Sequence, residues 1–182
     1  MSVKAVLLCE DQQMAAFMRR FLCQRLGWHN RSLRVLVSPP GAQSGEQWVR
    51  QHYPNELKAL RARHPRTLLC VATDADTLSV AQRIRTLEQQ CLEQSVAART
   101  AKEAVVLLVP KRNIESWLAY LRGSPIDESQ HYPRHRRESD CHTEVLALLS
   151  MCQQGSLRQP APPSLIAACA EWQRAQELPP IA

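Results

Sequence analysis

Four short apolar runs punctuate the first two-thirds of the chain. Each is five to seven residues long and apolar almost throughout, which is typical of strands buried on both faces of a parallel sheet. The runs span residues 3–9, 33–37, 67–73 and 104–109.

Apolar residues between and after these runs recur at helical spacing instead. The pattern predicts helices over residues 14–26, 45–63, 78–87 and 114–121. Gly27 and Asn113 stand where a helix end and a helix start are expected, and Pro54 marks a point where the second helix could be interrupted. Alternating strands and helices predict an α/β fold, with a parallel four-stranded sheet flanked by helices.

The last third of the chain has a different character. Residues 124–142 are polar and rich in His and Arg, and an apolar helix is expected over 143–152. After a proline-rich linker, Ser164 is expected to cap a last helix. We therefore predict an α/β domain over residues 1–123, followed by a polar loop and helical C-terminal appendage over 124–182.

Composition narrows the class of protein. The 182 residues carry a net charge of +6, which favours phosphate-rich partners, nucleic acid first. Seven Cys occur without a C-x-x-C pair, and Cys9, Cys70 and Cys169 lie in apolar runs, so buried thiols in a reducing compartment are expected. No apolar stretch approaches a membrane span and no signal peptide is evident, so a cytoplasmic location without membrane association is predicted.

Carboxylates follow two of the predicted strands. Glu10 comes directly after the first strand, and Asp74 and Asp76 come directly after the third. The carboxyl ends of parallel strands meet at one edge of the sheet, where ligands of such folds bind. Clustered carboxylates repel one another unless a cation neutralises them, and hard oxygen ligands suit Mg²⁺ or Mn²⁺. The alternative is that each acid caps a helix, a role that Asp76 before Thr77 could fill.

A Glu after the first strand and an Asp-x-Asp after the third resemble the Toprim fold of topoisomerases, bacterial primases, small maturation ribonucleases and OLD-type nucleases. The resemblance covers roughly residues 3–122 and implies that Glu10, Asp74 and Asp76 hold Mg²⁺, with the Glu also acting as general acid or base. Position 11 is Asp where many members have Gly. Position 78 is Leu where many have a third Asp, which resembles the nuclease branch more than the topoisomerase branch. Residues 109–117 resemble small Toprim-like proteins of prokaryotic defence loci.

The first functional hypothesis is a metal-dependent phosphoryl-transfer enzyme, in particular a nuclease. Lys111 would steady the scissile phosphate, and Glu115 would serve as an extra ligand or position water. Arg residues near the site would contact the backbone of DNA or RNA, and a small loop after the second strand could cradle a phosphate. The arginines are Arg112, Arg134, Arg136 and Arg137, and the loop residues are Gly41, Ser44 and Gly45.

Two other functions stay open. The same fold could be a non-catalytic module that binds nucleic acid or a partner ATPase subunit, since the chain has no Walker motif of its own. A receiver-like phosphorelay domain would use Glu10, Asp11, Asp74 and Lys111, although receivers place the Lys after a fifth strand. Homo-oligomer formation is also left open by the sequence.

Overall fold

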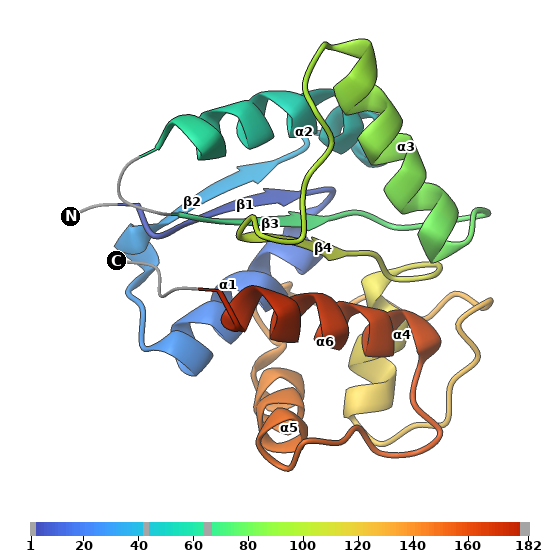
Figure 1. Cartoon of the computed structure of the whole chain (residues 1–182). Helices are drawn as coiled ribbons and strands as arrows, with labels where there is room; N and C mark the ends of the chain where they lie inside the picture. The colour runs from blue at the N-terminus through green and yellow to red at the C-terminus, as the bar shows by residue number, and fades with distance from the viewer. Residues whose placement is uncertain (1–2, 42–43, 64–66, 179–182) are drawn as a thin grey trace.

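The computed structural model describes residues 3–41, 44–63 and 67–178. Four parallel strands form one sheet in the order β2-β1-β3-β4 (Figure 1). In this sheet Leu7 pairs with Val35 on one side and with Cys70 on the other. The predicted α/β architecture is confirmed. The strands are β1 (Ala5–Cys9), β2 (Leu33–Val37), β3 (Leu68–Ala72) and β4 (Val105–Leu108).

Helices cover both faces of the sheet (Figure 1). One face carries α2 (Gly45–Ala62) and α3 (Val80–Glu93). The helices that pack on the other face are α1 (Gln12–Leu26), α4 (Ile114–Leu121), α5 (His142–Gln153) and α6 (Pro163–Gln176). A short 3₁₀ turn, Asn30–Ser32, leads into β2. Within the described residues, none of the helices is long and apolar enough to cross a bilayer.

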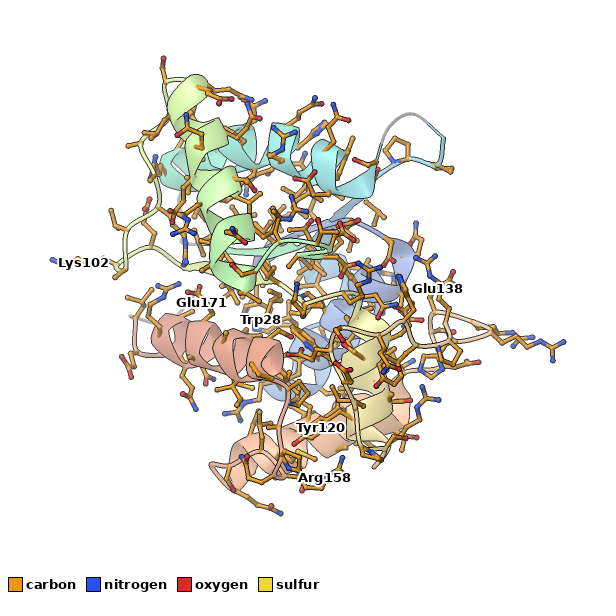
Figure 2. All side chains as sticks on the ribbon, turned by 90° about the vertical axis from the view of Figure 1, so that its right-hand side faces the viewer. Trp28, Lys102, Tyr120, Glu138, Arg158 and Glu171 are labelled. Atoms are coloured by element: carbon orange, nitrogen blue, oxygen red, sulfur yellow. The ribbon has the colours of Figure 1, made fainter. Side chains whose placement is uncertain are left out.

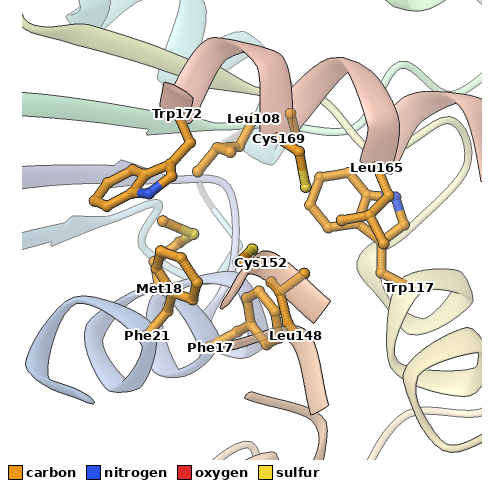
Figure 3. Close-up of a pocket in the computed structure, with 11 residues that line it drawn as sticks. Phe17, Met18, Phe21, Leu108, Trp117, Leu148, Cys152, Leu165, Cys169 and Trp172 are labelled. Carbon is orange, nitrogen blue, oxygen red and sulfur yellow. The ribbon is translucent and has the colours of Figure 1, made fainter. Parts of the chain in front are cut away.

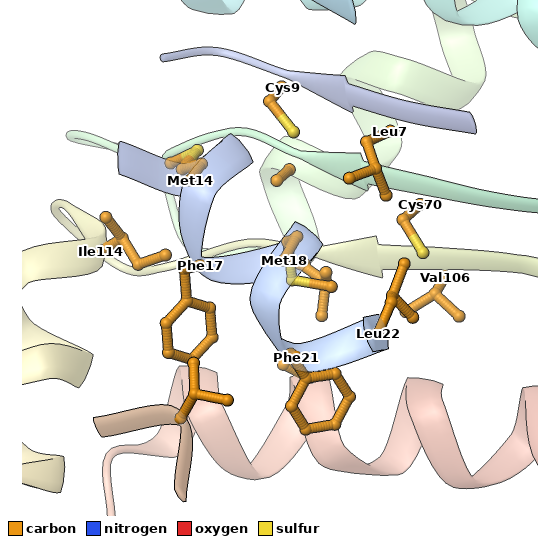
Figure 4. Close-up of a cluster of buried hydrophobic side chains, with 14 of the residues drawn as sticks. Leu7, Cys9, Met14, Phe17, Met18, Phe21, Leu22, Cys70, Val106 and Ile114 are labelled. Carbon is orange, nitrogen blue, oxygen red and sulfur yellow. The ribbon is translucent and has the colours of Figure 1, made fainter. Parts of the chain in front are cut away.

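Alternation along the strands divides the interior into two hydrophobic clusters. Leu7, Cys70 and Val106 point to the face of α1, where Figure 4 shows them packed with aromatic and methionine side chains. Leu8 and Val71 point to the face of α2 and α3. Residues of α5 and α6 belong to the first cluster, so the C-terminal helices share the core of the sheet.

Helix α2 runs uninterrupted through Pro54, a residue at which the sequence allows an interruption. Proline inside a helix costs about 3 kcal/mol, because it removes a hydrogen bond and crowds the preceding turn. Tyr53 and Leu57 beside it are 0% exposed, so their burial against the sheet offsets that cost.

The start of α6 differs from the sequence prediction. The helix begins at Pro163, with Pro162 at the N-cap position, so the expected cap by Ser164 is wrong. The Ser164 hydroxyl instead accepts a hydrogen bond of 2.7 Å from the indole of Trp117 on α4. A tertiary contact has therefore taken over the serine that looked like a local cap.

Helix α6 closes the β4 edge of the sheet through polar side chains. One oxygen of Glu171 accepts the Leu107 amide at 3.4 Å, and the carboxylate also pairs with Arg99 at 2.7 Å and 3.0 Å. Arg174 donates to the carbonyl of Ala101 at 2.7 Å and to that of Val105. Figure 2 shows Glu171 on the side of α6 that faces the sheet. The Leu107 amide and the Val105 carbonyl, two backbone groups of the edge strand β4, thereby find partners within the chain.

We expect Glu171→Ala to lower the free energy of unfolding by about 1–3 kcal/mol, because the Leu107 amide and the Arg99 guanidinium lose their acceptor. Glu177→Ala is the matched control, since Glu177 is exposed just after α6 and should matter by less than about 0.5 kcal/mol. Urea denaturation measures both. Equal losses in the two variants would contradict the assigned role of Glu171.

Candidate functional site

Glu10 joins the ends of β1 and β3. Its amide donates to the carbonyl of Ala72 at 2.9 Å, which continues the ladder beyond the strands. Its carboxylate oxygen Oε2 accepts hydrogen bonds from the Thr73 hydroxyl at 2.7 Å and the Asp74 amide at 2.9 Å. The parallel topology thus brings Glu10 to Asp74, as the sequence predicted.

Asp74 is held in place by backbone pairing on its other side. The amide of Ala75 donates to the Pro110 carbonyl at 2.8 Å, so the segment after β3 lies along the segment after β4. The Asp74 carboxylate oxygen Oδ1 is buried and has no hydrogen-bond partner within the described chain. A buried carboxylate with a free oxygen is costly unless a proton or a cation completes it.

The acidic groups at this edge perturb one another. Burial raises the pKa of Asp74 well above its ordinary range, and the charges of Glu10, Asp11, Asp76 and Glu115 raise it further. Burial also raises the pKa of Glu10 and of Glu115, although hydrogen bonds from Asp74 and Thr73 partly oppose it at Glu10. A group of carboxyls with raised pKa values at one edge of a sheet is a candidate functional site.

Asp76 is not a helix cap, which removes the main alternative interpretation of this residue. Helix α3 begins at Val80, and Ser79 caps it through a reciprocal capping box with Gln82. Asp76 has a positive φ of 54°, and its carboxylate lies 3.5 Å from the guanidinium of Arg83, with about half of the side chain (51%) exposed. The Asp-x-Asp spacing therefore brings a second, more exposed carboxylate beside Asp74.

Asp11, by contrast, has a structural role. Its oxygen Oδ1 accepts the Met14 amide at 2.9 Å and caps α1. Its other oxygen, Oδ2, lies 3.3 Å from the Arg134 guanidinium. The capping interpretation thus holds for the neighbour of Glu10, and Glu10 itself faces the end of β3.

Glu115 lies in the first turn of α4 and is 1% exposed. Arg134 Nε lies 3.3 Å from its Oε1, yet neither carboxylate oxygen has a hydrogen bond of good geometry within the described residues. The Asn113 cap position before it matches the prediction, although its side chain makes no cap hydrogen bond. Glu115 is therefore a buried acid whose charge is met by one long ion pair.

Lys111 lies at the same edge, but its ammonium group is occupied. It donates to the backbone carbonyls of Asp76 at 3.2 Å and Leu78 at 2.6 Å. Lys111 thus braces the turn that carries Asp76, while its predicted contact with a phosphate stays a prediction. Arg83, which the sequence did not single out, pairs with Glu46 at 2.6 Å and donates to the Asp74 carbonyl at 2.8 Å.

The four predicted nucleic-acid contacts have different surroundings. Arg134 reaches the carboxylates, and Arg112 donates to His131 at 3.1 Å. Arg136 and Arg137 are exposed and make no ion pair within the described chain. All but Arg112 belong to residues 124–142, which we call the strap.

The loop predicted to cradle a phosphate lies beside Glu10, although its residues 42 and 43 fall outside the described residues. Ser44 caps α2 by accepting the Gln47 amide at 3.2 Å. Gly41 has a positive φ of 81°. At Gly45 an added Cβ would stand 2.4 Å from Glu10 Cγ and 2.9 Å from the Glu10 carbonyl oxygen. Glycine is required there, because the first turn of α2 lies directly against Glu10.

A cleft of about 430 Å³ opens between this loop and the strap. It has the volume expected of a small-molecule or nucleotide site, and its walls combine carboxylate, guanidinium and imidazole groups. It is lined by residues 10–13, 37–41, Gly45, Arg134, His135 and Glu138.

A second cavity is apolar and lies elsewhere, among α1, α4, α5 and α6 (Figure 3). Its volume of about 30 Å³ would hold one water molecule, so it is a packing gap rather than a ligand site. Cys152 and Cys169 line it, and Cys169 is only partly buried, although it was expected to be buried like Cys9 and Cys70.

The side chains at this edge offer oxygen donors for a divalent cation. Within the described ranges, no three His, Cys, Asp or Glu side chains converge closely enough to hold a metal ion. The chemistry nevertheless fits one: the donors are carboxylate oxygens, they raise one another's pKa values, and Asp74 Oδ1 is buried without a partner. For Asp76 to join Glu10 and Asp74 as a metal ligand, its side chain would have to turn away from Arg83.

Comparisons with protein-family models, with curated proteins and with solved structures find no match for this chain.

We expect Gly45→Ala to destabilise the protein by about 1–3 kcal/mol, because the new Cβ would overlap Glu10. Without that overlap the change would stabilise a helix, so the sign of the effect is informative. Thermal unfolding measures it, with Gln51→Ala at an exposed position of α2 as control. A more stable Gly45→Ala variant would refute the close approach.

In the metal-free protein the contribution of Asp74 to stability should fall as the pH rises above the ordinary Asp74 value of 3.8. Folded Asp74 keeps its proton to higher pH than the unfolded chain does, so the folded state binds more protons in that window. Asp74→Asn is expected to raise the free energy of unfolding at pH 7 by about 0.5–2 kcal/mol, a gain that shrinks toward pH 3.8.

Urea denaturation in EDTA at several pH values measures this difference. Asp140→Asn, on the exposed part of the strap, is the control and should leave the pH profile unchanged. A constant difference at every pH would show that the Asp74 charge is not the cause.

Proposed function

We propose that this chain is a Toprim-like, metal-dependent phosphoryl-transfer enzyme, and in particular a nuclease. The observation that carries the proposal is the Asp74 carboxylate, which is buried with an unpaired oxygen, while the backbone amide of the same residue donates to the Glu10 carboxylate. Carboxylates that repel one another at the carboxyl ends of parallel strands are the setting in which Mg²⁺ or Mn²⁺ binds.

Each residue of the site has a proposed role. Glu10, Asp74 and Asp76 would hold Mg²⁺ or Mn²⁺, which supplies a Lewis acid for a phosphoryl oxygen when bound. Burial raises the pKa of Glu10, which favours a role for this carboxyl in holding or releasing a proton. Lys111 fixes the turn at Asp76. Glu115 is a further acid, whose charge raises the pKa of Asp74.

The substrate is proposed to be nucleic acid, DNA or RNA. The net charge of +6 favours a polyanion, and basic strap residues border the cleft beside Glu10. All seven Cys are free thiols, which fits a cytoplasmic location.

One observation favours a second function, a non-catalytic Toprim-like module that binds nucleic acid or a partner ATPase subunit. Asp76 pairs with Arg83 and no three ligands converge within the described residues. In that case the acidic cluster would keep its shape through arginine contacts, with no need of a metal.

Calorimetric titration with Mn²⁺, with and without a short oligonucleotide, distinguishes the two functions. The Asp74→Ala/Asp76→Ala double variant is expected to lose metal binding and to cut DNA or RNA at least 100-fold more slowly than wild type. Substrate phosphates often complete a Mg²⁺ site, which is why the oligonucleotide is included.

Asp140→Ala is the matched control, since it removes an exposed acid of the strap. Wild-type cleavage by the double variant would refute the nuclease proposal. Oligonucleotide binding that survives both EDTA and the double substitution, without cleavage by any variant, would instead establish the binding module.

A further inference from the structure

Arg134 reaches the acidic edge from a distant part of the sequence. Its Nε lies 3.3 Å from Glu115 Oε1 and its Nη2 lies 3.3 Å from Asp11 Oδ2. The arginine side chain is 72% exposed, whereas the Glu115 side chain is 1% exposed. A solvated cation thus enters from the surface to meet a buried anion.

The strap fixes Arg134 in this position through contacts on its C-terminal side. The side-chain amide of Gln13 donates to the Glu138 carbonyl at 3.1 Å, and the guanidinium of Arg20 donates to the Ser139 carbonyl at 3.0 Å. His135 lies 3.2 Å from the buried carboxylate of Glu144 on α5. Figure 2 shows Glu138 on the opposite side of the molecule from Glu171. The strap is therefore anchored to α1 and α5 beside the cleft.

The contact itself is one that a competitor can displace. Both arginine–carboxylate distances are 3.3 Å, long for charge-assisted hydrogen bonds, and neither oxygen of Glu115 has a well-aligned donor. Leaving the acids would cost Arg134 little, because most of its side chain is already in water. The buried Glu115 carboxyl, in contrast, needs a cation or a proton to offset its charge.

We propose that Arg134 is a tethered counter-ion that neutralises Glu115 and Asp11 until a divalent cation binds, and then pairs with a phosphate of the substrate. The proposal rests on the proposed function, since it requires a metal and a nucleic acid at this edge. Arg134 lines the cleft next to Glu10, so its guanidinium, once released, remains beside a nucleic acid bound there.

Two effects of opposite sign follow for Arg134→Gln. Mn²⁺ binding should become at least threefold tighter, because the ion no longer competes with a tethered charge. Binding of a single-stranded 12-mer in the presence of Mn²⁺ should become at least threefold weaker, because a phosphate contact is lost. A merely structural role for Arg134 would weaken both.

The experiment uses the full chain, with calorimetry for Mn²⁺ and fluorescence anisotropy for the labelled 12-mer, whose integrity is checked on a gel. Arg19→Gln is the matched control: Arg19 is an exposed arginine of α1 without an ion pair in the described chain, so the Mn²⁺ and 12-mer affinities of this variant should equal those of wild type. Urea midpoints verify that both variants fold.

Unchanged or weaker Mn²⁺ binding by Arg134→Gln, with normal binding by wild type, overturns this inference and leaves the proposed function intact. Tighter Mn²⁺ binding without a loss of 12-mer affinity overturns the transfer to phosphate. Absence of Mn²⁺ binding in wild type, with the 12-mer present, rejects the proposed function and this inference together.

Discussion

Repulsion among carboxyl groups is the constraint on which the strand-end edge depends. Glu10, Asp74 and Glu115 are drawn from three different elements and are partly or wholly removed from water. Such a group holds together only if protons, arginine or a bound cation offset its charge. The chain itself uses backbone and hydroxyl donors at Glu10 and guanidinium groups at Glu115 and Asp76. Asp74 Oδ1 has none of these partners within the described residues. The charge of the acidic groups is therefore not fully offset at the point where the parallel strands bring them together.

Much of the fold follows from the sequence because apolar runs and helical spacing are local signals. The four strands and the helices between them lie close to their predicted positions, except that α3 continues to Glu93, six residues beyond the predicted end. At Pro54 and Ser164 a tertiary contact overrides a local preference. Pro54 remains helical because Tyr53 and Leu57 bury their side chains, and Ser164 bonds to Trp117 instead of capping its helix. The contacts of Glu171 with β4 have no local signature, because they join residues more than sixty positions apart.

The site was predictable to the extent that parallel topology decides it. Glu10 and Asp74 meet because adjacent parallel strands end at the same edge. Thr73 directly precedes Asp74 in the sequence, and its hydroxyl is a signal for a hydrogen-bond donor to the Glu10 carboxylate. The position of Arg134 could not be predicted, because residues 124–142 lack periodicity and their path depends on contacts with α1 and α5. The need for glycine at position 45 is likewise visible only once α2 and Glu10 are placed in space.

The two edges of the sheet differ, because within the described residues side chains of α6 bond to β4 and not to β2. Glu171 and Arg174 occupy the Leu107 amide and the Val105 carbonyl of β4, which hinders pairing with a further strand at this edge. At the opposite end, β2 carries Val35 with 36% of its surface exposed. The closure is also late in time: a ribosome completes β4, α4 and α5 before it reaches α6. Until then the nascent sheet has two open edges, and the apolar face that carries α1 still lacks the part of its cover that α6 supplies. In this state chaperones and protein aggregation compete for the chain.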